Sequence, residues 1–441
     1  MGVARQSAPV RHELLERLQE ARERSDEVFR LVRGDALYDR PIPERHRIVF
    51  YIGHLEAFDW NLLSERVIGE PSIHPEFDRL FAFGIDPVGG GLPVDQPSDW
   101  PQAGEVQAYV RQARSVLDRR LDQILELGLK PHPELNRLLN VAIEHRLMHV
   151  ETLAYMLHQL AHEKKISQGA APRLVVPRVA SGMAEIREGA TTLGLPRASG
   201  EFGWDNEFEA LRVTVPAFEI DQCMVSNAQW LDFIHAGGYE EREFWSAADW
   251  EWKSSGRISH PVFWQKLGEQ WLYRTMFAEV PLPLDWPVYV SHAEASAYAR
   301  WAGKALPTEA EWQRAAYGGK DGEQRSYPWG EDPPSGRLCN ADFVNWDPIP
   351  VNALPFGESA FGVRGMLGNG WEWTSTPFAP LPGFEPFSFY PGYSADFFDG
   401  KHFVMKGGSS RTAACMLRST FRNWFQSHYQ YVYAGFRCVR R

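Results

Sequence analysis

The sequence has few cysteines and no long hydrophobic run. Its 441 residues include four cysteines, none of them in a CxxC pair, which excludes a zinc ribbon or a dense disulfide framework and favours a reducing compartment. No apolar segment is long enough to cross a bilayer, and the first residues lack the apolar core of a signal peptide. We therefore expect a soluble, cytoplasmic protein without a membrane partner.

Positive charge is also in short supply. Lys and Arg number 46 against 57 Asp and Glu, so the net charge is −11 at pH 7, and no basic tract is present. Proteins that bind nucleic acid through its phosphates usually have the opposite balance, so we expect no nucleic-acid partner. Aromatic residues are plentiful, with 17 Trp, 15 Tyr and 26 Phe, which favours well-packed interiors over disorder. The length predicts two or three domains.

Helical patterns dominate residues 1–168. Apolar residues recur at helical spacing in four segments, residues 9–32, 44–67, 105–127 and 133–165. Between the second and third segments, residues 69–101 are rich in Gly, Pro and Asp, which predicts a long loop of functional importance. Four helices joined in this way favour an up-down four-helix bundle.

The composition changes after residue 168. Residues 169–176 are typical of a linker, and residues 177–441 are rich in Gly, Pro and Trp with short apolar runs. Ser or Thr N-caps predict three helices, over residues 226–236, 291–301 and 308–316. We expect the rest to pack irregularly around aromatic residues such as Trp371 and Trp373, without strands in the core. The fold class predicted for the whole chain is α+β.

The most chemically informative stretch is residues 144–152, which read EHRLMHVET. His145 and His149 are four residues apart, so on a helix both imidazoles lie on one face and can reach one metal ion. The best third ligand is His54, because two helices of a bundle can converge on a shared ion. The same spacing recurs at His158 and His162, so a pair alone is also compatible with hydrogen-bonded or exposed histidines.

Six ordered blocks after residue 224 resemble the formylglycine-generating-enzyme, or sulfatase-modifying-factor, family. They are VSNAQW (225–230), LPTEAEWQRAA (306–316), YPWG (327–330), GNGWEWT (368–374), KGGS (406–409) and AGFRCVR (434–440). Where the formylglycine generators bind copper through a cysteine pair, this chain has Thr412 and Leu417, with Cys415 out of register. Copper-dependent formylglycine formation is therefore not expected.

The H…HxxxHxE pattern in a helical bundle joined to this domain resembles the ergothioneine and ovothiol synthase group. These non-haem iron enzymes attach sulfur to the imidazole ring of histidine derivatives. The resemblance implies a DinB-like bundle, Fe(II) bound by His54, His145 and His149, and dioxygen as co-substrate. Glu151 matches the acidic residue of the motif and either acts beside the ligands, which we favour, or faces solvent. It also implies that the C-terminal domain lines the active site. Met148 stands where many relatives have Gln, and is either a core methionine or a substrate contact.

On the side of the sulfur donor, the chain departs from the sulfoxide synthases of this group. Phe425 and Tyr429 stand where many of them have a carboxylate and a guanidinium, and Gln96 replaces a further arginine. A zwitterionic cysteine or γ-glutamylcysteine would then bury charges without partners, at a cost of roughly several kcal/mol. A neutral co-substrate is indicated, and the chain is similar to the selenoneine synthases, which join a selenosugar to hercynine, the trimethylated betaine of histidine.

The hercynine side is retained, whereas a proton donor is missing. Asn423 matches the family's asparagine that binds the backbone end of the substrate, and Trp424 offers an aromatic face to a quaternary ammonium group. Phe378 stands where the synthases have a tyrosine that supplies a proton near the iron. Tyr390, Tyr393 and Tyr429 are the candidates for its replacement, and the sequence does not rank them.

These observations predict an iron- and dioxygen-dependent enzyme that forms a carbon–selenium bond at C2 of hercynine from a selenosugar. The first alternative is a hercynine sulfoxide synthase of ergothioneine biosynthesis that uses cysteine or γ-glutamylcysteine. The second alternative is a metal-free, non-catalytic binding module, because the C-terminal fold also serves as a scaffold that displays ligands. The oligomeric state stays open.

Overall fold

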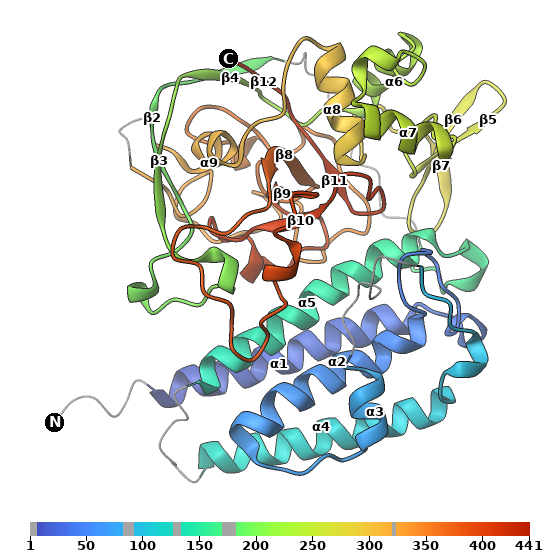
Figure 1. Cartoon of the computed structure of the whole chain (residues 1–441), viewed down its shortest axis with the longest axis vertical. Coiled ribbons are helices and arrows are strands. Elements are labelled where there is room, and N and C mark those ends of the chain that lie inside the picture. Colours follow the sequence, from blue (N-terminus) through green and yellow to red (C-terminus); the bar gives the residue numbers. More distant parts are fainter. Residues whose placement is uncertain (1–6, 83–91, 127–133, 170–181, 320–322) are drawn as a thin grey trace. The chain divides into compact units, whose positions relative to one another are not determined.

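Two compact units make up the chain, divided between Gln168 and Gly169 (Figure 1). The computed structural model describes residues 7–82, 92–126, 134–169, 182–319 and 323–441. The first unit is helical and the second is mixed, so the α+β prediction is confirmed. Apart from Gly169, the predicted linker at residues 169–176 lies outside the described residues.

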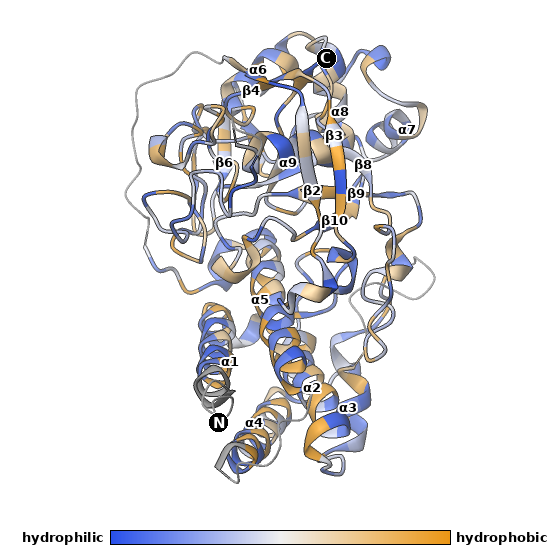
Figure 2. Ribbon diagram, turned by 90° about the vertical axis from the view of Figure 1, so that its left-hand side faces the viewer, coloured by the Kyte–Doolittle hydropathy of each residue, from blue (hydrophilic) through white to orange (hydrophobic). Residues whose placement is uncertain are grey.

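Four long helices form the described part of the first unit: α1 (Ser7–Arg30), α2 (Ile48–Leu63), α4 (Ala103–Glu126) and α5 (Leu135–Gln159). Helix α1 packs against α5, and α2 packs against both α4 and α5. Figure 2 shows hydrophilic and hydrophobic residues interspersed along these helices, as expected for amphipathic segments. Most residues of α2 and α5 are buried, so their polar side chains need partners inside the bundle.

The second helix is shorter than predicted. Its α-helical part begins at Ile48 rather than at residue 44, because Arg47 has an extended conformation. Its last turn is a π-helix, Ser64–Ile68, which ends at Gly69 with a φ of 69°. A left-handed residue of this kind is favourable for glycine and ends the helix there.

The predicted loop at residues 69–101 contains a short helix, α3 (Pro75–Leu80). Its N-cap is His74, whose Nδ1 accepts the backbone N–H of Phe77 at 3.2 Å. With six residues the helix is too short to show a helical period, so the pattern did not predict it. The glycine triplet at residues 89–91 lies outside the described residues.

The helices of the second unit begin at capped residues. Helices α6 (Asn227–His235), α8 (His292–Trp301) and α9 (Glu309–Tyr317) follow complete capping boxes at Ser226, Ser291 and Thr308. A further helix, α7 (Ala247–Ser255), was not predicted, although Ser246 caps it by accepting the N–H of Asp249.

The expectation of a core without strands is wrong. In the largest sheet the order is β10-β9-β8-β11, with bounds Asn423–Gln426, His402–Lys406, Trp371–Pro377 and Ala434–Gly435. A second sheet has the order β1-β4-β12 (Met183–Ile186, Phe218–Asp221, Val439–Arg440). Strands β2 and β3 (Gly189–Leu193, Leu211–Val215) form a two-stranded sheet, and β5, β6 and β7 (Trp264–Leu267, Gln270–Arg274, Glu279–Pro281) form a three-stranded one.

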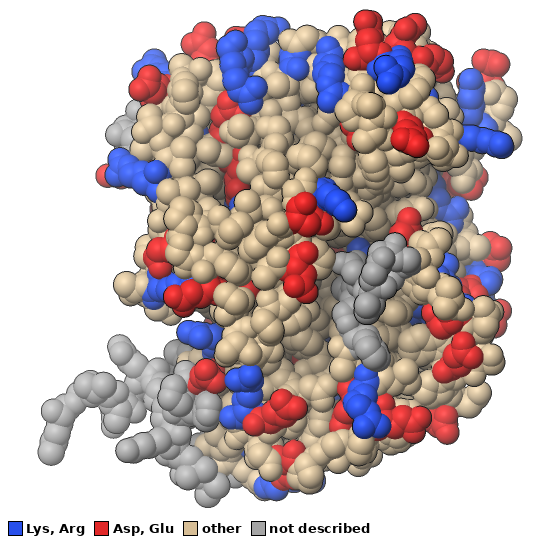
Figure 3. All heavy atoms as spheres, in the orientation of Figure 1, with Lys and Arg blue, Asp and Glu red and all other residues tan. Residues whose placement is uncertain are grey.

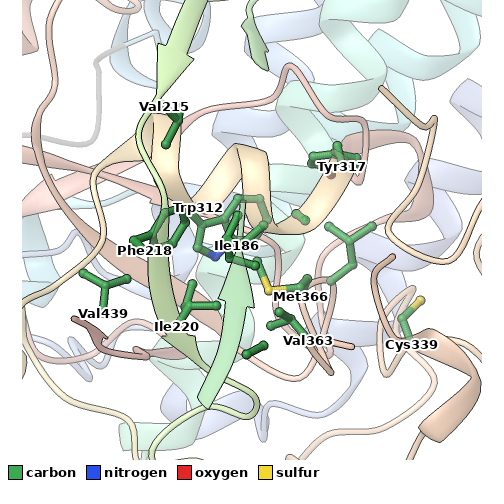
Figure 4. Close-up of a cluster of buried hydrophobic side chains, with 14 of the residues drawn as sticks. Ile186, Val215, Phe218, Ile220, Trp312, Tyr317, Cys339, Val363, Met366 and Val439 are labelled. Carbon is green, nitrogen blue, oxygen red and sulfur yellow. The ribbon is translucent and has the colours of Figure 1, made fainter. Parts of the chain in front are cut away.

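A buried cluster joins helix α9 to the strands of the second unit. Trp312 of α9 is fully buried among Ile186, Phe218, Ile220 and Met366 (Figure 4). Burial of such aromatic and branched side chains contributes about 1.5–3 kcal/mol each. Trp371 and Trp373 are buried as well, at 3% and 0% exposure, in agreement with the expectation that they are core residues.

The polar residues of the GNGWEWT block are satisfied within the second unit. Asn369 serves backbone groups: it donates to the carbonyl of Ile349 and accepts the N–H of the same residue. Glu372 instead accepts from two buried side chains, the indole of Trp312 at 2.9 Å and the guanidinium of Arg437 at 2.6 Å. On the outer surface, Lys and Arg are interspersed with Asp and Glu over the face in Figure 3.

Candidate metal centre and donor-side residues

Three histidines converge inside the helical bundle. His54 lies on α2, and His145 and His149 lie one turn apart on α5. One ring nitrogen from each lies within 4.8 Å of the others, and the Nε2 atoms of His54 and His149 are 3.2 Å apart. The three side chains are only 3–4% exposed. Among the described residues, this is the one group of three or more potential ligands that could hold a metal ion.

A hydrogen bond to the main chain determines the tautomer of His54, and so which of its ring nitrogens has a free lone pair. Its Nδ1 lies 2.7 Å from the main-chain oxygen of Phe81. A carbonyl oxygen can only accept, so Nδ1 carries the proton, and Nε2 of the neutral ring presents a lone pair. On His149, the buried Nδ1 has no hydrogen-bond partner among the described residues. Three imidazoles with a ring nitrogen each within 4.8 Å of the others fit a divalent transition metal.

The environment keeps these imidazoles neutral. Burial lowers the pKa of His54 to about 4, although the hydrogen bond to Phe81 acts in the opposite direction. Burial together with the neighbouring imidazoles also holds the pKa of His145 and of His149 well below the ordinary value. Neutral imidazole is the form that coordinates metals, so the site is in its ligating state at neutral pH without a prior loss of protons.

Aromatic rings surround the histidines. Phe58 stacks on His145 with ring centroids 3.4 Å apart and an interplanar angle of 11°. Phe50 stacks on His54 at 4.9 Å and 20°, and Tyr51 lies 5.8 Å from the ring of His149. These contacts restrict rotation of the imidazoles and exclude water, which favours a preorganised set of ligands.

A buried ion-pair network ties the ligand-bearing helices together, and the sequence patterns did not predict it. Arg146 of α5 is fully buried and donates to Glu56 at 2.9 Å and to Asp59 at 2.6 Å, both on α2. Arg114 of α4 donates to Glu56 and to Asp26 of α1, each at 2.7 Å. Burial alone would raise the pKa of Glu56, but Arg146 and Arg114 outweigh it and lower the pKa to about 2.

The remaining candidates of the first unit are less closely defined. Glu151 is buried and Met148 half-buried on α5, beside His149, and their roles stay predictions. Gln96 is exposed, and its side chain donates to the carbonyl of Val94 at 3.2 Å while its backbone N–H binds Asp99. In the described structure, Gln96 therefore stabilises its own turn.

In the second unit, the two positions predicted to face the co-substrate that donates sulfur or selenium are direct neighbours. Phe425 of β10 and Tyr429 stack with centroids 5.0 Å apart and an interplanar angle of 16°. Tyr431 meets the ring of Tyr429 edge-on at 5.5 Å. Both Phe425 and Tyr429 are half-buried. Because the two side chains are in contact, a substitution at position 425 would alter the surroundings of residue 429, and the reverse. Variants should therefore change both residues together.

A second aromatic group of this unit centres on Trp424. Phe378 stacks on Trp424 at 4.1 Å and 6°, and Tyr393 meets its edge at 5.4 Å. Tyr390 lies farther out, 5.5 Å from Tyr393. Next to Trp424, Asn423 accepts the backbone N–H of Trp424 at 2.8 Å, which orients its side chain. One indole face of Trp424 is thus covered by Phe378.

The positions that would carry copper ligands in formylglycine generators have structural roles here. Thr412 accepts the backbone N–H of Ser409 at 2.8 Å, and Leu417 is fully buried. Cys415 is half-buried, and none of the four cysteines forms a disulfide.

Comparisons with known proteins identify both parts of the chain. Residues 17–153 match the DinB superfamily, and residues 173–441 match the Sulfatase-modifying factor enzyme 1-like domain. A hercynine oxygenase of Mycolicibacterium thermoresistibile is 36% identical over 453 residues, which cover 99% of this chain and 96% of that protein. The chain belongs to the hercynine oxygenase family. The resemblance to a DinB-like bundle joined to a sulfatase-modifying-factor domain, as in the ergothioneine synthase group, is thereby confirmed; these relatives do not single out the selenoneine synthases.

Further members of the hercynine oxygenase family and related proteins match over most of the chain. The hercynine oxygenase of Mycolicibacterium smegmatis is 33% identical over 440 residues, covering 97% of this chain and 98% of its own. Ergothioneine biosynthesis protein 1 of Neurospora crassa is 29% identical over 491 residues, covering 92% of this chain and 55% of its own. As a member of the hercynine oxygenase family, the chain is an enzyme. Over the described residues, no helix is both long and apolar enough to span a membrane.

Proposed function

We propose that the protein is an Fe(II)- and dioxygen-dependent enzyme that acts on the imidazole ring of hercynine. The observation that supports this most directly is the group of three buried, neutral imidazoles within 4.8 Å, in a chain 36% identical to a hercynine oxygenase. His54, His145 and His149 would hold the ion. When bound, ferrous iron would supply the electron chemistry that lets dioxygen react with an organic substrate.

The chain's own residues would arrange the reactants. Three protein ligands would leave coordination positions open for substrates. Binding the reactants at one centre would make their reaction effectively unimolecular, which lowers the entropic part of the barrier. The stacked rings of Phe50 and Phe58 fix two of the imidazoles and keep the surroundings apolar. Such an environment strengthens the interactions of charged groups within the site.

The proposed donor is a neutral selenosugar. Phe425 and Tyr429 stack on each other where the resembled sulfoxide synthases carry a carboxylate and a guanidinium. Because the two side chains are in contact, these positions can hold either an ion pair, as in the sulfoxide synthases, or the stacked aromatic pair of this chain. Aromatic faces with a phenolic hydroxyl suit a sugar ring, whereas a zwitterionic thiol would lose both charge partners.

The proposed reaction balances with dioxygen as the oxidant. The C2–H bond of hercynine and the Se–H bond of the donor break, and a C–Se bond forms, which removes two hydrogens and two electrons. Oxidation of selenium to the selenoxide removes two more electrons. Dioxygen accepts all four, with one oxygen atom ending on selenium and the other in water. The sulfur reaction of the alternative function has the same balance.

The hercynine side of the proposal rests on Asn423 and Trp424. A quaternary ammonium cannot donate hydrogen bonds and is held best by aromatic faces. Phe378 covers one face of Trp424, Tyr393 meets its edge and Phe397 lies 5.7 Å away, so the ammonium group would be held by this aromatic cluster rather than by Trp424 alone. Tyr393 contacts Trp424 directly and Tyr390 does not, so Tyr393 is the better candidate to replace the missing proton donor.

The experiment that tests the proposed function compares the two donors. Protein reconstituted anaerobically with Fe(II) is mixed with hercynine and either the selenosugar or γ-glutamylcysteine, air is admitted, and the products are identified by mass. We expect a hercynyl selenium product from the selenosugar. Consumption of the thiol alone would replace the selenium assignment by the sulfoxide synthase alternative. A lack of bound iron and of product with both donors would favour the non-catalytic binding module.

A double variant tests the assignment of the donor-side residues. Phe425→Asp combined with Tyr429→Arg restores a charge pair, so we expect kcat/KM for γ-glutamylcysteine relative to the selenosugar to rise by about 100-fold, since buried groups discriminate strongly between partnered and unpartnered ligands. The matched control, Phe425→Asn with Tyr429→Gln, has similar size without charge and should weaken both donors alike. An unchanged donor ratio in the charged variant would contradict the assignment.

A further inference from the structure

The residue before His54 is a glycine, Gly53, although helix geometry does not require a glycine at that position. Gly53 lies in the interior of α2, where glycine is less favourable than alanine by about 0.5–1 kcal/mol. It does not adopt a positive φ, so its backbone conformation is one that any residue can have. A glycine at this place therefore indicates a spatial requirement.

That requirement comes from Phe81. A Cβ atom at position 53 would lie 2.5 Å from Cγ and Cδ2 of the Phe81 ring and 2.6 Å from Cδ1. These distances are far below ordinary carbon–carbon contact, and the ring cannot yield easily because it is fully buried. The absence of a side chain at Gly53 thus lets the segment that carries Phe81 lie directly against α2.

The Phe81 segment is itself fixed by its surroundings. Phe81 follows α3, and its N–H donates to the carbonyl of Phe77 at 2.9 Å. Its ring lies 5.5 Å from the ring of Phe77 and 6.1 Å from that of Tyr109. Carbonyls at the end of a helix lack partners within the helix, so the oxygen of Phe81 is available to a side chain. It accepts from Nδ1 of His54 at 2.7 Å.

We propose that Gly53 and Phe81 are positioning residues for the metal ligand His54. The missing side chain at position 53 allows close approach of Phe81, and the Phe81 carbonyl fixes the ring of His54 with Nδ1 protonated and the Nε2 lone pair directed toward His149. This inference rests on the proposed function, in which His54 binds the ion. Helix α3 would then have a role in the site, because it places the carbonyl group of Phe81 next to His54.

A double-mutant cycle tests the positioning role through metal affinity. Fe(II) is titrated anaerobically against a competing chelator in wild type, Gly53→Ala, Phe81→Ala and the combined variant. We expect Gly53→Ala to weaken Fe(II) binding about 10- to 100-fold, as for other lost partners of metal-bound histidines. In the Phe81→Ala background the ring that clashes is gone, so the same change should weaken binding less than threefold.

The matched control is Gly104→Ala in helix α4. A Cβ atom at Gly104 would meet nothing within 4 Å, so this variant should bind Fe(II) as wild type does. Far-UV circular dichroism should show undiminished helix in both glycine variants. Wild-type affinity in Gly53→Ala, or an equal loss in both Phe81 backgrounds, would overturn the positioning role. Failure of wild type itself to bind Fe(II) would instead overturn the proposed function.

A measurement on the unsubstituted protein tests the same inference independently of folding in the variants. Nitrogen-15 spectra of histidine-labelled, metal-free protein distinguish the two neutral tautomers, and His54→Gln assigns the signal. We expect His54 to carry its proton on Nδ1. A proton on Nε2 in the metal-free wild type would overturn the inference, including in the case that Gly53→Ala does not fold.

Discussion

His149→Ala is expected to reduce bound iron from one ion per chain to near zero and to lower turnover on hercynine by more than about 100-fold, beyond the range seen when only an outer partner of a ligand is lost. The Nε2 atom of His149 lies 3.2 Å from that of His54, and its ring lies 4.5 Å from the ring of His145. Its removal leaves two imidazoles, which cannot complete a three-ligand site. Iron content by elemental analysis and product formation by mass spectrometry check this result.

The control for this prediction is His162→Ala. His162 follows His158 at the same four-residue spacing, but it lies in a short 3₁₀ turn after α5 rather than in the group of three histidines. Iron content and turnover should therefore match wild type. Full iron content in His149→Ala, or equal losses in both variants, would contradict the assignment of the metal centre to the His54 group.

The sequence predicted the histidine pair because helical periodicity converts a four-residue spacing into a shared face. The same reasoning cannot bring His54 to that face, because His54 and His149 are 95 residues apart and only tertiary packing joins them. Resemblance to a family supplied that link. The carbonyl of Phe81 had no signal of its own, since every residue has one. A glycine inside a predicted helix, Gly53, could have indicated a close approach of another segment, but no prediction was drawn from it.

Buried charge was missed for a related reason. Arg146 lies between His145 and Leu147 in the sequence, and periodicity alone does not distinguish a buried arginine from an exposed one. Its partners Glu56 and Asp59 are three residues apart on another helix, in a pattern that also fits a solvated face. Only the packing of α2 against α5 shows that these three side chains form one network.

In the second unit, the sequence predicted helices but not sheets. Capping boxes are local, so the helices after Ser226, Ser291 and Thr308 were predicted from a few residues each. The sheet was not, because β8, β9 and β11 join segments that are distant in sequence, as in the pairing of Trp373 with Met405 and of Ala434 with Trp371. Long-range pairing is set by burial of both partners rather than by local pattern.

Arg146→Met is expected to destabilise the helical unit by about 3–5 kcal/mol, because it leaves the buried carboxylates of Glu56 and Asp59 without their shared partner. Methionine fills a similar volume, so lost packing contributes little. For a unit of this size, such a loss lowers the melting temperature by on the order of 10 °C. Thermal unfolding of the full chain, followed by far-UV circular dichroism, measures it.

The matched control is Arg24→Met on α1, because Arg24 forms a pair with Glu27 in which both side chains are about half exposed, at 46% and 48%. Exposed pairs of this kind contribute about 0.2–1 kcal/mol, so the melting temperature should change little. Arg146 also joins the two helices that carry the histidines, so Arg146→Met should weaken Fe(II) binding as well. Equal melting temperatures for the two variants would show that the buried network does not hold α2 against α5.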